Sequence, residues 1–332
     1  MSWGAALVAA LLIVLPRPAT WIVALAAFLV RGGLLVFLVP IVVVPSPVDL
    51  GTTLGPTITT FVFGGLSAEL ALVLAAVFAT FLAWMLVGGW AAGVTETHLI
   101  ETVATDEDAP LAGAVRPPTP ARRRGRVWRI VLLRIAGHVP LAVVLAWGSV
   151  RVIEAAYREL TVPGDVLVPI ALRVVGRVPD AIVAIVAAWC LGEILGSIGA
   201  RRLVLRGQSL DHAYLGAWAD LLRRPVTAVA TFAVPSVVLL LVVGPIALAS
   251  GIAWDWLRTV LGGGSSNGVL DVLLALVSFV AIWAAGLVLA GLLAAWRSAA
   301  ATVEAIRGRG TYGASRHRRP GDWPDPEPSG SL

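Results

Sequence analysis

Arg134, His138 and Glu193 are ionisable residues inside long apolar runs of this chain. Arg134 and His138 are four positions apart, so a helix would place them on one face. Glu193 lies between Gly192 and Gly196 in a different run, where a buried carboxylate needs a partner. We therefore expect a Glu193–Arg134 pair. It is either a structural ion pair or part of a polar patch that handles a proton, an ion or a lipid headgroup, since charges at membrane depth are costly and mark candidate sites.

Arg31 is a fourth candidate, and two interpretations of it stay open. It lies in the apolar run Trp21–Val44, nine residues before Pro40. Nine residues of helix span about 13 Å at 1.5 Å per residue. If Pro40 lies at mid-membrane, Arg31 approaches the membrane boundary and its guanidinium can snorkel into the headgroups. The alternative is that Arg31 joins the polar site.

No other motif points to chemistry. His98 and Glu101 share a helix end, but no further His or Cys completes a metal set. The glycine-rich run 262–268 lacks the Gly-Lys-Ser/Thr ending of a phosphate loop, and no Gly-x-Ser-x-Gly elbow is present. Cys190 is the only cysteine, so no intramolecular disulfide can form. We expect no cofactor, no metal and no catalytic residue.

The elements that must position these residues follow from composition. Of 332 residues, 58% are hydrophobic and 14% are charged, against about 45–50% and about 25% in soluble proteins. These values exclude an ordinary soluble enzyme, a disordered chain, a disulfide scaffold and a collagen-like chain. They predict an all-α, polytopic bundle of transmembrane helices.

Six apolar segments are long enough to cross a bilayer, and none alternates as a β-barrel strand would. We expect three hairpins in which proline-containing and glycine-rich helices alternate. The first, third and fifth segments carry a Val-Pro pair at Pro40, Pro140 and Pro235. Glycines at GxxxG spacing, which favours close helix packing, are Gly89 with Gly93 and Gly192 with Gly196. The six segments are Trp21–Val44, Ala68–Gly93, Val127–Val150, Val178–Gly199, Val226–Ile252 and Leu270–Trp296.

Arginine distribution predicts the orientation. Every one of the 25 basic residues is arginine, and most flank the ends of the glycine-rich segments. The positive-inside rule then places both termini in the cytoplasm of a bacterial cell, with the chain in the inner membrane. The first charge is Arg17, so a cleavable signal peptide is not evident. The apolar stretch Trp3–Leu15 is too short to cross, and we interpret it as a half-inserted helix or, alternatively, a tilted partner of the next helix.

Two stretches predict amphipathic helices on the membrane surface. Ser209–Arg224 has helical apolar periodicity with Ser209 as N-cap, and Pro163–Arg177 has a shorter apolar face. We expect arginines to contact anionic lipid headgroups rather than nucleic acid. A homo-oligomer or a membrane-protein partner stays open. We divide the chain into a transmembrane domain, 1–306, and a disordered cytoplasmic tail, 307–332.

The motif Ala217-Trp218-Ala219-Asp220-Leu221-Leu222-Arg223-Arg224-Pro225, with Ala295-Trp296-Arg297-Ser298-Ala299 and Thr302-Val303-Glu304, resembles bacterial six-helix membrane proteins. It is most similar to the membrane domain associated with some glycerophosphodiester phosphodiesterases, over residues 200–305. The resemblance implies a fold type and a lipid connection. The chain departs from those enzymes because it has no acid–histidine cluster for phosphodiester hydrolysis.

The sequence thus predicts a non-enzymatic membrane protein that handles or passes a small or lipid-like solute. One alternative is a structural or assembly subunit of a membrane complex. A membrane-embedded lipid-modifying enzyme is the less favoured alternative. Any polar site would be carried by Glu193, Arg134, His138 and Arg31.

Overall fold

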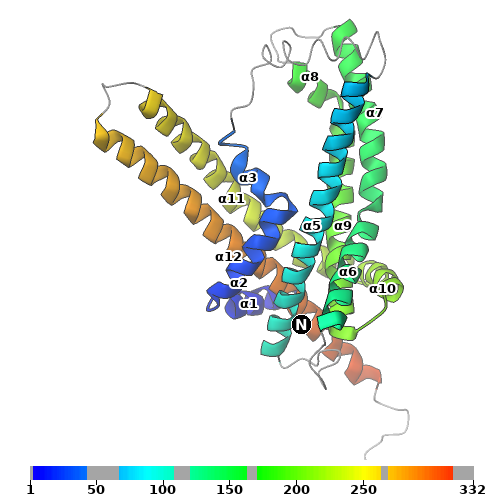
Figure 1. Ribbon diagram of the computed structural model, residues 1–332. Coiled ribbons are helices and arrows are strands. Elements are labelled where there is room, and N and C mark those ends of the chain that lie inside the picture. Colours follow the sequence, from blue (N-terminus) through cyan, green and yellow to red (C-terminus); the bar gives the residue numbers. More distant parts are fainter. Residues whose placement is uncertain (1–2, 43–66, 108–119, 163–169, 263–267, 317–332) are drawn as a thin grey trace, which may run out of the picture.

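The computed structural model describes residues 3–42, 67–107, 120–162, 170–262 and 268–316, and these residues form helices and turns without a strand (Figure 1). The described residues form both short helices and membrane-length helices. In order they are α1 Trp3–Val14, α2 Pro18–Phe28, the kinked segment η1 Leu29–Gly33, α3 Leu34–Leu38, α5 Ala68–Asp106, α6 Pro120–Gly137, α7 Val139–Thr161, α8 Ile170–Arg177, α9 Pro179–Arg206, α10 Leu210–Arg223, α11 Pro225–Gly262 and α12 Val269–Arg316.

Six apolar helical stretches in the described part of the chain are long enough to cross a membrane, which confirms the all-α fold and the predicted number of crossing segments. Large apolar side chains such as Leu72, Leu240 and Val269 are exposed on these helices, as lipid-facing residues are. The three-hairpin order and its alternating proline and glycine helices stay predictions. The six stretches are Pro18–Leu38, Ala71–Asp106, Arg124–Glu159, Pro179–Arg206, Pro225–Gly262 and Val269–Arg307.

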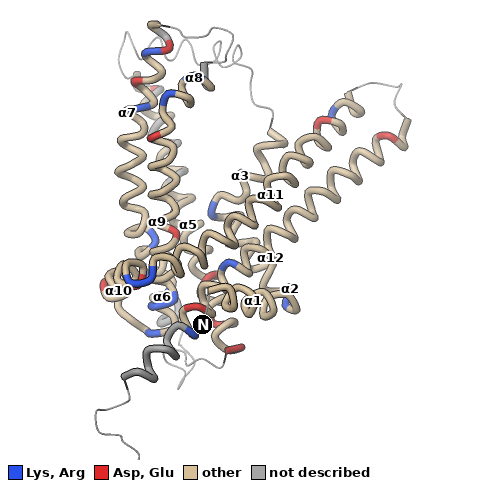
Figure 2. Tube along the Cα trace, turned by 180° about the vertical axis from the view of Figure 1, so that it is seen from behind, with Lys and Arg blue, Asp and Glu red and all other residues tan. Residues whose placement is uncertain are grey.

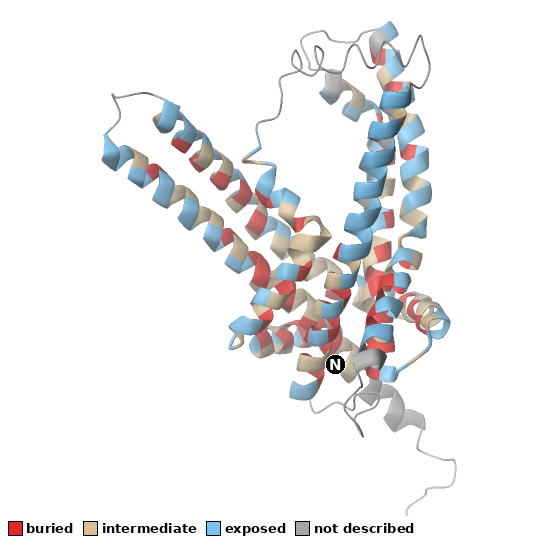
Figure 3. Ribbon diagram, viewed as in Figure 1, coloured by how far each residue is buried: buried red, intermediate tan, exposed pale blue. Residues whose placement is uncertain are grey.

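The molecule has two arms that diverge from a common base. Helices α11 and α12 form one arm, and α5, α7 and α9 form the other (Figure 1). The arms meet where α1, α2 and α6 lie, and the buried residues concentrate in this base (Figure 3). Arg, Asp and Glu also gather at the base, with a second group near α7 and α8 at the opposite end (Figure 2). The junction of the arms is therefore where charged side chains become buried.

The three Val-Pro pairs occupy different local structures. Pro40 lies in the turn after α3, and Pro140 lies in the first turn of α7, directly after the break at His138. Both follow the tendency of proline to begin or end helices, because it lacks an N–H group and clashes with the preceding turn. Pro235, in contrast, lies inside the continuous helix α11 together with Pro245.

The second crossing segment is longer than the sequence predicted. We expected it to end at Gly93, but α5 continues to Asp106. Beyond Gly93 the chain turns polar, yet the helix carries this polar stretch into the base of the molecule against α2 and α6. The extension has a functional consequence, because it brings Glu96 into the buried junction.

The short N-terminal helix packs on the last long helix. The indole Nε1 of Trp296 in α12 donates a hydrogen bond of 2.9 Å to the Leu7 carbonyl oxygen of α1. Ala299, Ala300 and Val303 of α12 belong to the same buried cluster as α1. How deeply α1 enters a bilayer stays a prediction.

Helices α10 and α8 lie within the two stretches predicted as amphipathic helices, and their position on a membrane surface stays a prediction. Helix α10 lies within the predicted Ser209–Arg224, with Ser209 at the N-cap position, although its side chain bonds His212 rather than the helix backbone. Helix α8 covers 170–177 of the predicted 163–177, and 163–169 lie outside the described residues. Helix α12 extends to Arg316, into the stretch 307–332 predicted as a tail, and 317–332 again lie outside the described residues.

Helices α2 and α12 approach closely at Gly291. A methyl group added there would lie 2.7 Å from the backbone oxygen of Trp21, a contact that requires the helices to separate. We expect Gly291→Ala to lower the free energy of unfolding by about 1–3 kcal/mol, the usual range for overpacking. An SDS titration of the purified protein, followed by circular dichroism, measures this loss.

Gly244→Ala in α11 is the matched control, because an added methyl group there meets nothing within 4 Å. It should leave the unfolding midpoint unchanged or raise it slightly, since alanine favours helix more than glycine does. Equal midpoints for the two variants would contradict the close α2–α12 contact.

Candidate functional site

Glu96 lies at the centre of a buried ionic cluster where the two arms meet. It is 4% exposed, and its carboxylate accepts hydrogen bonds from three arginines on three different helical segments. Oε2 is 2.7 Å from Nη2 of Arg31 and 2.7 Å from Nη2 of Arg134, while Oε1 is 3.1 Å from Nη1 of Arg201. A buried carboxylate needs such partners to offset the loss of hydration. Glu96 therefore ties η1, α6 and α9 to α5.

Arg31 reaches Glu96 from a kink in the segment Leu29–Gly33, which interrupts the first crossing helix. Gly32 has a φ of 104° and ψ of −6°, a conformation that glycine adopts without a steric penalty. A Cβ atom at Gly33 would lie 2.3 Å from the ring of Phe28, so a larger residue there would have to displace this ring. The kink thus carries the arginine of the site.

Arg134 bridges the two carboxylates of the cluster. Its Nε and Nη2 atoms donate to Glu96, and its Nη1 atom donates to Oε1 of Glu193 at 3.3 Å. His138, one turn further, donates from Nδ1 to the Arg134 carbonyl oxygen at 2.8 Å, because a carbonyl can only accept. Its Nε2 atom is then left facing Oε1 of Glu193 at 3.7 Å. Arg134 thus contacts both glutamates directly.

The close packing of α6 on α9 brings Arg134 and Glu193 into contact. A methyl group added at Gly192 would lie 3.0 Å from the Gly137 carbonyl oxygen, and one added at Gly196 would lie 3.2 Å from Cγ of Arg134. Small residues at this spacing allow helix backbones to approach. The glycines flanking Glu193 therefore create the space that the Arg134 side chain occupies.

Arg201 is the most buried arginine of the cluster, at 3% exposure. Its Nη1 atom donates to the carbonyl oxygen and the hydroxyl of Ser197, and its Nη2 atom donates to the carbonyl oxygen and the hydroxyl of Ser298. These bonds connect α9 to α12, so Arg201 links the two arms directly. Its Nε atom is buried and has no hydrogen-bond partner in the structure.

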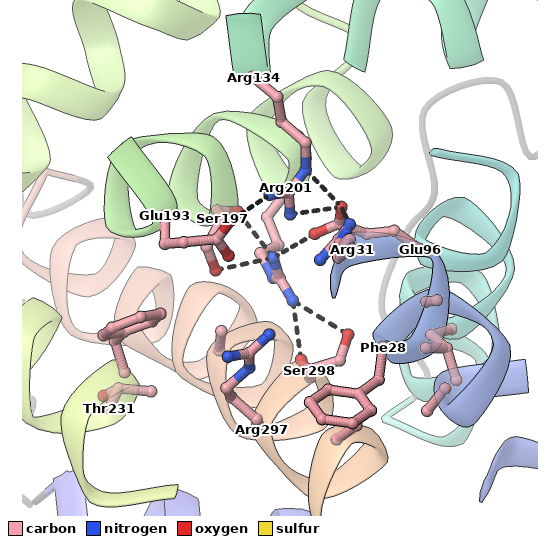
Figure 4. A pocket seen from close by; sticks show the side chains of 16 residues that line it. Phe28, Arg31, Glu96, Arg134, Glu193, Ser197, Arg201, Thr231, Arg297 and Ser298 are labelled. Carbon is pink, nitrogen blue, oxygen red and sulfur yellow. Dashed lines mark hydrogen bonds and ion pairs between the residues drawn. The ribbon is translucent and has the colours of Figure 1, made fainter. Parts of the chain in front are cut away.

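A cavity of about 50 Å³ lies against this arginine–glutamate cluster, which we define as Arg31, Glu96, Arg134, Glu193 and Arg201. Figure 4 shows Arg297 and Ser298 of α12 on the side of the cavity opposite Arg134. The Arg297 guanidinium lies 5.6 Å from the ring centroid of Phe232, a cation–π geometry. No carboxylate of the described residues lies within 4 Å of Arg297, although every other arginine of the cavity bonds Glu96.

The structure brings all four sequence-predicted residues to one place. Arg134 and Glu193 are in direct contact, and His138 faces the same carboxylate. Of the two interpretations of Arg31, the structure shows the one in which it joins the polar cluster, since it bonds Glu96 instead of extending alone to a boundary.

Sequence reasoning missed three residues of the site, namely Glu96, Arg201 and Arg297. Glu96 follows the end of the apolar run at Gly93, so it resembled a residue of an exposed helix end. Arg201 and Arg297 follow apolar runs and were counted as boundary arginines that set orientation. The available signal was periodicity: Glu96 is three residues after Gly93 and seven after Gly89, on the face already expected to pack.

Comparison with known proteins does not assign the site to a family. No protein-family model, curated protein or solved structure matches this chain. The function is therefore inferred from the geometry of the site. Within the described ranges, no group of three or more His, Cys, Asp or Glu side chains is arranged to hold a metal ion.

A second buried carboxylate lies at the opposite end of the molecule. Glu159 of α7 is 2% exposed and bonds Arg173 of α8 at 3.0 Å and also Arg177. This group fixes α8 onto α7. It involves neighbouring elements of the chain, whereas the arginine–glutamate cluster joins segments from both arms.

Proposed function

We propose that the chain is a multi-spanning inner-membrane protein that binds a small or lipid-like solute at the arginine–glutamate cluster and handles or passes it without covalent chemistry. The observation that carries this proposal is the cavity beside a cluster whose charges do not cancel. Four arginines line the cavity, but only two glutamates do. An ion network that serves folding alone gains most when its charges are paired and packed, because unpaired buried charge is destabilising.

The environment of each glutamate argues against an acid–base role. Glu96 accepts hydrogen bonds from three arginines and Glu193 from one, so both carboxylates are already held by cations. A general base must instead reach the proton it removes. This is why the proposal assigns binding rather than catalysis, and why a lipid-modifying enzyme is less favoured.

The proposed orientation places the base of the molecule at the cytoplasmic face, with both chain termini inside the cell. Support comes from the arginines that gather at this end, around α6 and α10 (Figure 2), because such residues flank cytoplasmic membrane boundaries. The site would then lie close to the inner leaflet. The lipid connection implied by the sequence resemblance agrees with a ligand drawn from that leaflet.

Water access to the cavity tests the proposal. Cys190 is the only cysteine, so Cys190→Ala gives a background without thiols. Ala301 lines the cavity, and Ala301→Cys in this background should react with a negatively charged, membrane-impermeant methanethiosulfonate reagent. The fraction of protein labelled, measured by intact mass spectrometry, reports whether water and anions reach the site.

Ala300→Cys is the control, because Ala300 is the preceding residue of the same helix and is 0% exposed in the packed core. We expect labelling of Ala301→Cys to exceed that of Ala300→Cys at least tenfold. If neither thiol reacts in the folded protein, the bundle is dry at this point. That result would favour a structural or assembly subunit of a membrane complex.

A further inference from the structure

We infer that the cavity binds a phosphate group, held by Arg297 and Arg201 of α12 and α9. This inference rests on the proposed function and specifies the chemical class of its ligand. A phosphate group occurs both in lipid headgroups and in free phosphorylated solutes, and the site contacts only this shared part. Three properties of the cavity support this ligand: its charge, its unoccupied hydrogen-bond donors and its size.

The charge of the cavity selects an anion. Arg31, Arg134, Arg201 and Arg297 face Glu96 and Glu193, which leaves two positive charges in excess. In a water-poor setting this excess is destabilising, and an anion of charge −1 to −2 offsets it. A phosphodiester carries one negative charge and a phosphomonoester between about 1.5 and 2 at neutral pH. The charges of both phosphate groups fall in the required range, whereas the charge of a cation or of a neutral sugar does not.

The unoccupied donors point to an oxyanion. Arg297 has no carboxylate within 4 Å among the described residues, and its Cζ atom lies 5.6 Å from the centroid of the Phe232 ring. The Nε–H of Arg201 is buried without an acceptor. Buried donors are rarely left unpaired in folded proteins. Guanidinium groups match the oxygens of phosphate with paired hydrogen bonds, which is why arginine is common at phosphate sites.

Two hydroxyl groups add further donors. The Oγ atoms of Ser197 and Ser298 each accept a hydrogen bond from Arg201, at 2.9 Å and 3.2 Å. Neither hydroxyl donates to another residue in the described part of the chain, so each retains its proton for a ligand. Thr231, which also lines the cavity, instead donates to the Thr227 carbonyl oxygen and can only accept. The serines and arginines together offer a phosphate several donors from two helices.

The size of the cavity fits a phosphate group but not the whole of a larger ligand. About 10–15 Å³ of comparable volume accommodates one water molecule, so about 50 Å³ accommodates a group of a few heavy atoms. A phosphate fits this volume, and the remainder of a larger ligand would have to extend outside it. The diverging arms carry exposed apolar residues that could contact lipid chains (Figure 3).

Binding of two phosphate-containing probes to the purified full-length protein tests this inference. Inorganic phosphate represents the free source, measured by equilibrium dialysis with a radioactive label. Phosphatidic acid in mixed micelles represents the lipid source, measured by native mass spectrometry against diacylglycerol, which lacks the phosphate. We expect at least one phosphate probe to bind, and the probe that binds more tightly identifies the source.

Arg297→Gln should weaken that binding by about tenfold to a hundredfold, the usual effect of losing a charge-assisted contact. Because Arg297 has no carboxylate partner, this variant should remain folded, which its unfolding midpoint checks. Arg297→Lys keeps the charge without the paired donors and should bind with intermediate affinity. The control is Arg258→Gln, which removes an arginine that is 49% exposed and faces Asp255 at the far end of α11.

Two results would overturn the inference: neither phosphate probe binds, whether or not succinate does, or Arg297→Gln binds the phosphate probe as tightly as the unchanged protein. These outcomes differ from failure of the proposed function. If Ala301→Cys is labelled and phosphate does not bind, only the choice of ligand is wrong. If Ala301→Cys is not labelled in the folded protein, the proposed function fails as well.

Discussion

Glu96→Gln is expected to lower the free energy of unfolding by about 3–5 kcal/mol, the usual loss when one partner of a buried ion pair is removed. The glutamine keeps the shape of the side chain but leaves Arg31, Arg134 and Arg201 without their shared carboxylate. The positive excess of the cavity rises from two charges to three. An SDS titration followed by circular dichroism measures the change in unfolding free energy.

Two further variants isolate the cause. Glu154→Gln removes a carboxylate that is 57% exposed and 3.7 Å from Arg151, and such surface pairs contribute about 0–1 kcal/mol. Adding Arg31→Gln to Glu96→Gln returns the positive excess to two charges and should recover part of the loss. If Glu96→Gln unfolds at the same SDS concentration as the unchanged protein, the cluster does not hold the arms together.

Arg201→Met is the second large expected effect, a loss of about 2–4 kcal/mol in the free energy of unfolding. The methionine fills much of the space but removes the hydrogen bonds to Glu96, Ser197 and Ser298, and bonds to charged groups contribute about 1.5–3 kcal/mol each. The loss is smaller than for Glu96→Gln because removing an arginine reduces the positive excess. The same SDS titration measures it.

Arg206→Met is the matched control, because Arg206 lies in the last turn of the same helix and is exposed. We expect a change of about 0.5 kcal/mol or less, as for most surface substitutions. Arg201→Lys should not restore stability, because an ammonium group cannot replace the separate donors of a guanidinium. A larger loss for Arg201→Met than for Glu96→Gln would contradict the charge balance on which the ligand inference depends.

The charged residues that line the cavity therefore have two separable roles. Glu96 and Arg201 join the arms and should affect stability most, while Arg297 faces the cavity without a carboxylate partner and should affect ligand binding most. Glu193→Gln should have a smaller effect on stability than Glu96→Gln and a larger one than Arg297→Gln, because Glu193 has a single arginine contact of 3.3 Å. A site with a stable frame and one available cation can release its ligand without losing its fold.

Much of the fold could be predicted from the sequence because its determinants are local. Six apolar runs predicted six membrane-length helices, and the periodicity of Ser209–Arg224 predicted helix α10. The boundaries were less accurate. Gly93 and the polar residues after it suggested a helix end. Helix α5 instead continues to Asp106, because the extended helix packs against α2 and α6.

About half of the candidate site could be predicted from the sequence. The Arg134–Glu193 pair followed from two unfavourable charges in neighbouring segments, and these residues are in contact. The central residue, Glu96, was not identified, because a glutamate just beyond an apolar run is ordinarily exposed. Arg201 and Arg297 were not identified for a related reason, because arginines near helix ends ordinarily set the orientation of the helices in the membrane. Each of the three residues has an unremarkable sequence position, and only its surroundings distinguish it.

The sequence by itself determined that this protein is an all-α chain with six membrane-length helices and several charges in apolar surroundings. These properties depend on composition and on hydrogen bonds within each helix, which neighbouring residues supply. The tertiary structure decided which charges meet. Glu96 and Arg201 are 105 positions apart, and their contact depends on how α5 and α9 are rotated and crossed. Burial then makes the balance of charge matter, so only the packed bundle shows a cavity with two arginine charges in excess.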